Sequence, residues 1–194
     1  MYQPNYLEID TKLAAALAFC ERHPELRSAE YGPAVRSVLE RFRQVTRETD
    51  AHYTEWRVLL GKQLTAFKQA RLSYDRGVAL ADEHGYDDFP RRKIVYTEEE
   101  HLLRLLADAM AWLKPREGEW PWIAELHGAL QRHVQEAKQI RRQTDHVYQD
   151  YTHIIKRRVR AYQDSVAMLR EFLRDVRAEG SFVEEAKAFT LDLG

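Results

Sequence analysis

The sequence predicts an all-α fold, in which a short-helix/long-helix hairpin is duplicated in tandem and forms an elongated helical bundle. Composition is the first observation, because the 194 residues include only 8 Gly and 6 Pro while 44% are apolar, which favours helices with a core. Second, apolar residues recur every three or four positions over two long stretches. Third, residues 47–56 return as residues 142–151, at an offset of 95 that is close to half the chain.

The first predicted hairpin starts with a short helix over residues 6–23. Asn5 can accept hydrogen bonds from the first turn and Glu8 can reach back, as in a capping box. A helix of 50–55 residues, about 75–85 Å long, should then run from Pro33 to Gly85, a residue that favours a left-handed C-cap. The predicted apolar stripe of this long helix contains Val38, Phe42, Val45, Tyr53, Trp56, Leu60, Leu64, Phe67, Tyr74, Val78 and Ala81.

The second predicted hairpin repeats this order. Thr97 and Glu100 form another capping-box pattern, and the short helix should stop before Pro115. The second long helix should end at Gly180, which follows Gly85 by the same 95 residues. Its predicted stripe contains Ile123, Leu126, Leu130, Val134, Ala137, Ile140, Tyr148, Tyr151, Ile155, Val159, Tyr162, Val166, Leu169, Leu173 and Val176.

These elements divide the chain into four predicted segments. Four main helices lie in two hairpins, and Ser181 with Glu184 favours a short C-terminal helix near residues 182–189. The connecting segment is rich in charge and contains Pro90, which is typical of a linker. The predicted segments are 1–85 for the first hairpin, 86–96 for the linker, 97–180 for the second hairpin and 181–194 for the C-terminal helix and tail.

Composition also limits the classes of function. A net charge of −1 argues against nucleic acid as a partner, because phosphate binding needs a cationic surface. The single cysteine, Cys20, cannot form an internal disulfide, and no signal-peptide pattern is seen, so a cytoplasmic protein is expected. The longest apolar run, residues 13–20, is too short to span a membrane. Cys20 itself lies on an apolar helix face and is expected to be a buried, unreactive side chain, and no motif for a cofactor is recognised.

The repeated Arg-x-Thr-Asp-x-x-Tyr motif supplies the candidate ligand-binding residues. On a helix, residues three and four apart share a face, so Tyr53 should lie beside both Thr49 and Trp56. One interpretation is a polar layer that fixes the register of the long helices; the other is a ligand pocket in which Arg47 and Arg142 help to anchor the ligand. The candidate residues are Thr49, Asp50, Tyr53, Trp56, Thr144, Asp145, Tyr148 and Tyr151.

A metal centre is a weaker alternative. Ferritin-like sites use two Glu-x-x-His motifs and two more carboxylates, and the chain offers only Glu98 with His101 and Asp150 with His153. The basic run at residues 156–160 is expected to be a solvated helix face, with an acidic or phosphate-bearing partner as the other interpretation.

The predicted long helices extend past the short ones, so their apolar stripes need another covering surface. We therefore expect a non-enzymatic scaffold or adaptor that binds a protein partner through exposed helical faces, or that pairs with a second copy of itself. The alternative is a helical bundle that binds a small ligand or a metal at the Asp/Tyr layer. No catalytic residue is assigned from the sequence.

Overall fold

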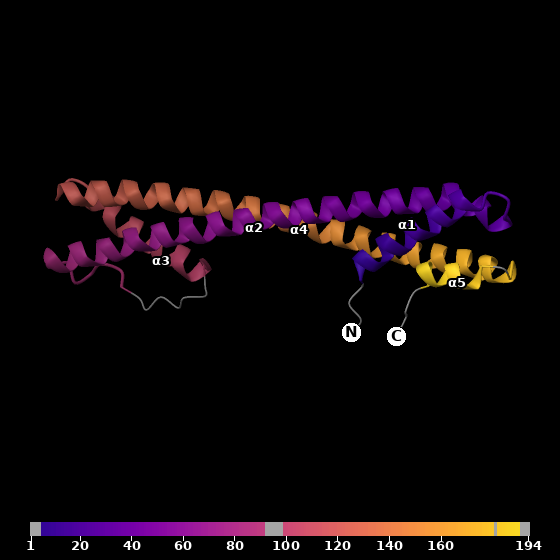
Figure 1. Ribbon diagram of the computed structural model, residues 1–194. Helices are drawn as coiled ribbons and strands as arrows, with labels where there is room; N and C mark the ends of the chain where they lie inside the picture. Colours follow the sequence, from indigo (N-terminus) through magenta and orange to yellow (C-terminus); the bar gives the residue numbers. More distant parts are fainter. Residues whose placement is uncertain (1–4, 92–98, 181, 191–194) are drawn as a thin grey trace. The chain divides into compact units, whose positions relative to one another are not determined.

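The computed structural model describes residues 5–91, 99–180 and 182–190, and it confirms the all-α fold (Figure 1). Two long helices dominate, α2 (Gly32–Glu83) with 52 residues and α4 (Pro121–Ala178) with 58, so α4 is slightly longer than predicted. The shorter elements are α1 (Tyr6–Arg22), η1 (Arg27–Tyr31), α3 (Glu99–Leu113), η2 (Lys114–Arg116), α5 (Val183–Ala186) and η3 (Lys187–Phe189).

The helix ends follow the predicted capping residues where these are described. The side chain of Asn5 accepts a hydrogen bond from the Glu8 amide at 3.1 Å. Gly85 has a φ of +74° and Gly180 a φ of +72°, a left-handed conformation that glycine adopts without strain. Beyond α2, the amide of Tyr86 donates to the carbonyl of Ala81 at 2.8 Å, which completes a Schellman motif. Thr97 and Ser181, the other predicted caps, lie outside the described residues.

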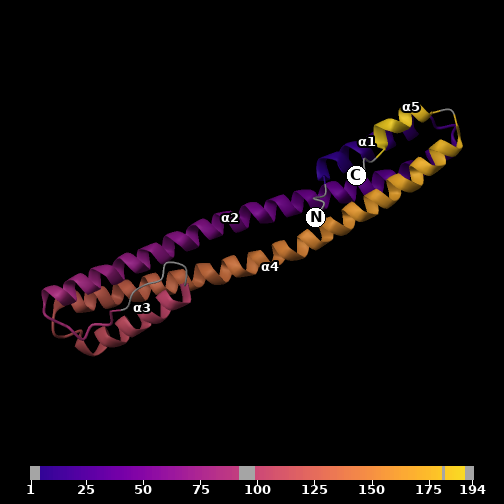
Figure 2. The same cartoon turned by 90° about the horizontal axis from the view of Figure 1, so that it is seen from below.

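Contacts divide the chain into two compact units, which cut across the predicted hairpins. Unit 1 comprises residues 1–53 and 149–194, and unit 2 comprises residues 54–148. Each unit therefore contains one short helix, α1 or α3, and part of both long helices. Within each unit the segments of α2 and α4 run antiparallel, and the short helix packs against them (Figure 2).

Each unit has its own hydrophobic core. In unit 1, Phe19 and Phe172 are fully buried, with ring centroids 5.8 Å apart. In unit 2, Leu106 and Leu113 of α3 pack against Ile123, and all three are buried. These cores explain why the short helices are required, since each covers the apolar side of both long-helix segments of its unit.

The first part of the predicted linker is packed onto unit 2. Phe89 is buried, the hydroxyl of Tyr74 donates to the carbonyl of Pro90 at 2.7 Å, and the indole of Trp112 donates to Asp88 at 2.9 Å. Residues 86–91, whose charge and proline predicted a linker, thus form a packed turn and not an open connection. Residues 92–96 of the predicted linker lie outside the described part of the chain.

Hydrogen bonds join η1 to the end of α4 in unit 1. The amide and hydroxyl of Ser28 both donate to the carboxylate of Glu179, at 2.9 and 2.7 Å. The hydroxyl of Tyr31 donates to Asp175 at 2.8 Å. This hydrogen bond stabilises the ionised carboxylate of Asp175 and so lowers its pKa. The same hydrogen bond holds the proton on the Tyr31 hydroxyl and so raises the pKa of Tyr31.

Candidate functional site

The two threonines of the candidate layer are buried within their own units. Thr49 lies in unit 1 and Thr144 in unit 2, and both are almost completely inaccessible. Each hydroxyl donates to the carbonyl four residues earlier in its helix, Thr49 to Val45 at 2.7 Å and Thr144 to Ile140 at 2.9 Å. Both hydroxyl protons are therefore used inside a helix, a common arrangement for a buried threonine.

The two aspartates lie on the surface. Asp50 is exposed and its carboxylate is 3.6 Å from the guanidinium of Arg158, within unit 1. Asp145 is exposed as well, and its carboxylate is 3.9 Å from the guanidinium of Arg141 on the preceding turn of α4, within unit 2. Both ion pairs are solvent-screened, so each contributes little to stability.

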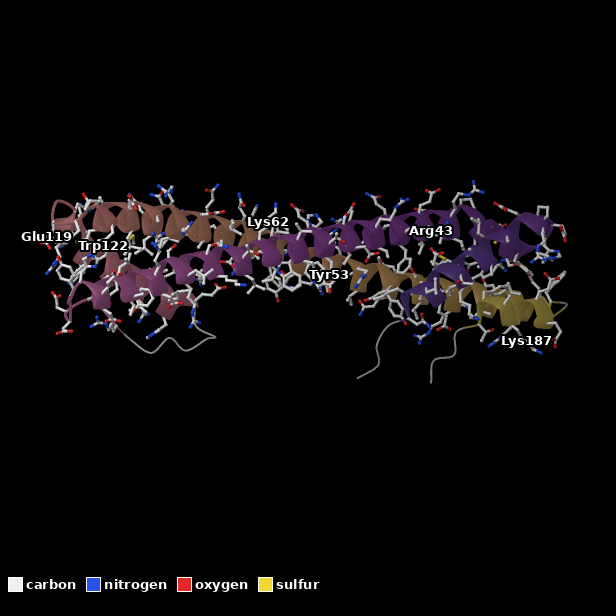
Figure 3. The ribbon with its side chains drawn as sticks, turned by 60° about the vertical axis from the view of Figure 1, so that its left-hand side comes forward. Arg43, Tyr53, Lys62, Glu119, Trp122 and Lys187 are labelled. Atoms are coloured by element: carbon white, nitrogen blue, oxygen red, sulfur yellow. The ribbon has the colours of Figure 1, made fainter. Side chains whose placement is uncertain are left out.

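The four aromatic residues form two ring pairs, one in each unit. In unit 1 the ring centroids of Tyr53 and Tyr151 are 5.6 Å apart, and in unit 2 those of Trp56 and Tyr148 are 5.5 Å apart. Tyr53 is 40% exposed and Tyr148 is 48% exposed, and the Tyr53 side chain is labelled in Figure 3. Both tyrosines belong to the predicted apolar stripes, and no part of their own unit covers them completely. A ligand-binding role for the eight residues stays a prediction.

The residues of the alternative metal centre lie in different units. Glu98 is outside the described residues, His101 is in unit 2, and Asp150 and His153 are in unit 1. Within the described ranges, no group of three or more His, Cys, Asp or Glu side chains is arranged to hold a metal ion.

The basic run of α4 includes two arginines that pair with acids of α2 in unit 1. Arg157 lies 3.1 Å from Glu48, and Arg158, which also contacts Asp50, lies over the ring of Tyr6 at 4.3 Å from its centroid. Lys156 and Arg160 are exposed. The basic run is therefore solvated only in part, because the side chain of Arg158 is 19% exposed.

Cys20 is buried in the unit 1 core, as predicted. Burial raises the pKa of its thiol to about 11, because the thiolate would lose its hydration. The thiol is therefore protonated at neutral pH and is a poor nucleophile there.

The sequence interpretation expected exposed apolar faces but did not identify the residues that form one on α2. Val58 is 54% exposed, Leu64 61% and Leu72 50%. Leu64 belongs to the predicted apolar stripe, whereas Val58 and Leu72 were not singled out. The signal was present in the sequence, since Val58 and Leu72 are two heptads apart.

A serine–histidine pair was also missed. In unit 2 the hydroxyl of Ser73 and Nδ1 of His133 are 2.8 Å apart, and Ser73 lines a pocket of about 50 Å³ together with Arg76 and Glu125. Both residues of the pair lie inside long helices, whose amides are engaged in the helix. We therefore interpret the pair as a hydrogen bond that joins α2 to α4 within unit 2.

Comparison with protein-family models, with curated proteins and with solved structures gives no significant match. In the described part of the chain, no helix is both long and apolar enough to cross a membrane.

Proposed function

We propose that the chain is a non-enzymatic helical scaffold or adaptor, which binds another protein through exposed faces of its long helices. One observation carries this proposal: Val58, Leu64 and Leu72 of α2 are each at least half exposed on a helix that already has a buried face. Covering such side chains is favourable by roughly 25 cal/mol per Å² of apolar surface. A protein surface that covers them would gain this free energy.

The proposal includes a duplicated origin for the two halves. It is supported by the shared order of a short and a long helix, by the same threonine hydrogen bond at Thr49 and Thr144, and by the positive φ of Gly85 and Gly180. The two threonines are 95 residues apart, and so are the two glycines. A duplicated bundle would offer long helical faces without requiring a symmetric catalytic site. We further propose that the protein acts in the cytoplasm, since its one cysteine is a free, buried thiol.

Site-specific photo-crosslinking tests the scaffold function. A photoreactive amino acid is placed at Leu72, and in a matched variant at Gln163, an exposed residue of α4. In the cells from which the gene comes, we expect a discrete protein adduct at Leu72 and none of that mass at Gln163. Failure to form any adduct at Leu72, or the same adducts at both positions, would contradict the proposal.

Light scattering on the purified protein tests the form of the proposal in which the partner is a second copy. A mass that rises with concentration towards twice 22.9 kDa is expected if the chain pairs with itself. A constant monomer mass rejects self-association and leaves a different protein as the partner.

A further inference from the structure

We propose that α2 of unit 2 binds an acidic amphipathic helix along a narrow exposed strip, here called the outer seam. The outer seam consists of Val58, Gly61, Thr65, Leu72 and Ala79, all of which are exposed. This inference rests on the proposed scaffold function and names the class of its partner.

The spacing of the outer seam is that of a coiled coil. Val58, Thr65, Leu72 and Ala79 follow one another at intervals of seven, and Gly61 lies three residues after Val58. In heptad terms the first four are a positions and Gly61 is a d position. At 100° per residue, all five lie within an arc of about 60°. This arc is narrower than the apolar face, 100° wide or more, that covers a core or lies on a membrane.

The charges beside the outer seam indicate the kind of partner. The flanking e and g positions are cationic or uncharged: Arg57, Lys62, Leu64, Gln69, Arg71, Arg76 and Val78. The two d positions that follow Gly61 are charged, with Lys68 at the first and Asp75 at the second. Asp75 is the one acid among these positions, and its carboxylate is 3.7 Å from the guanidinium of Arg71. A second copy of this face, parallel or antiparallel, would place cations opposite cations. A helix with Glu or Asp at its flanking positions would instead be complementary.

Three of these cations are available for such a partner. Within the described residues, Lys62, Lys68 and Arg76 make no hydrogen bond or ion pair, and Lys62 and Lys68 are exposed on α2, where Figure 3 labels Lys62. Pairing them with carboxylates across an interface would therefore not break an internal ion pair.

Gly61 provides an independent observation. Glycine weakens a helix interior relative to alanine, yet a Cβ added at Gly61 would meet nothing within 4 Å. No neighbour in the chain thus requires a glycine there. A second helix that approaches α2 closely at this point does require a small residue, because the missing side chain lets the backbones come together.

Two designed peptides test the proposal on the full-length protein. Both are about four heptads long with Leu at a and d, and one carries Glu at e and g where the other carries Lys. By fluorescence anisotropy we expect the Glu peptide to bind about tenfold more tightly than the Lys peptide. The triple variant K62E/K68E/R76E should reverse this preference, and the variant V58S/L72S should weaken Glu-peptide binding by about tenfold or more.

The control variant K156E/R160E changes exposed cations of α4 in unit 1 and should keep the preference of the unmodified protein. All the substituted residues of these variants are exposed, so circular dichroism should show unchanged helix content. If the helix content of a variant falls, that variant is replaced in the binding assay by single substitutions at the same positions.

Equal binding of the two peptides, or no binding of either, would overturn the proposal. A dimer of the unmodified protein that is lost in V58S/L72S would also overturn it, because the outer seam would then bind a second copy. Binding to vesicles of anionic lipid that is lost in the same variant would overturn it as well. Adducts at Leu72 without a Glu-peptide preference would reject the acidic helix but keep the scaffold function. Absence of adducts at Leu72 would reject the scaffold function itself.

Discussion

Two glycines of α2 lie in opposite surroundings. A Cβ at Gly77 would approach Leu126 Cδ2 to 2.7 Å and Phe89 Cζ to 3.2 Å, whereas a Cβ at Gly61 would meet nothing within 4 Å. Gly77 therefore lets α4 and the packed turn come close to α2 inside unit 2, while Gly61 is open to the surroundings of the chain.

Replacing each glycine by alanine separates these roles. Both changes raise helix propensity by roughly 1 kcal/mol, but only Gly77→Ala also overpacks the core. We expect Gly77→Ala to be less stable than Gly61→Ala by about 1–3 kcal/mol, measured by urea unfolding of both variants. Equal unfolding free energies would show that Leu126 and Phe89 move aside without cost.

At this scale the sequence predicts the buried face of α2 only in part. Gln63 is buried because its amide donates to the carboxylate of Glu99 at 2.8 and 3.0 Å, whereas Leu64 beside it is exposed. A hydropathy pattern assigns the leucine inward and the glutamine outward. The opposite outcome depends on a partner from α3, which periodicity along one helix does not reveal.

At the scale of elements, a single substitution can test how much the hydrogen bonds between η1 and the end of α4 stabilise unit 1. Ser28→Ala removes the hydroxyl that donates to Glu179 at 2.7 Å in a fully buried position. We expect unfolding to become easier by about 1–3 kcal/mol, and the amides of η1 to lose hydrogen-exchange protection. Ser37→Ala, at an exposed position of α2, is the matched control and should leave both measurements unchanged.

The elements themselves are largely predictable from local sequence. Residues within a few positions of each other determine the capping role of Asn5 and the two long helices. The same holds for the ends of α2 and α4 near Gly85 and Gly180. The docking of η1 is different, since Ser28 and Glu179 are separated by 151 residues. Nothing in either local segment specifies that pairing, so it emerges only in the folded chain.

At the scale of the whole molecule, the two cores are separated along both long helices by stretches with few buried side chains. Among the described residues, α2 has no buried apolar side chain between Val45 and Ala66, and α4 has none between Ala137 and Ile154. Thr49, Gln63 and Thr144 are the buried residues there, and all three are polar. The candidate layer falls within these stretches.

Native-state hydrogen exchange should detect this difference. We expect amides of residues 51–62 and 142–153 to exchange at least about tenfold faster than those of residues 35–45 and 66–81, because few buried contacts oppose local opening there. Mass spectrometry of peptic fragments measures the rates. Uniform protection along α2 would show instead that the long helices open only with the cores.

The division into units also has a consequence for the order of folding during synthesis. Unit 2 is one continuous stretch, residues 54–148, so all of its core residues have been translated before the last part of α4 is made. Unit 1 joins the first 53 residues to a stretch that starts at residue 149, and Phe19 must wait for Phe172. Helix α1 thus leaves the ribosome before any part of unit 2, yet its core is complete only after residues 149–194 have been made. Until then its apolar face depends on chaperones or on local collapse for protection.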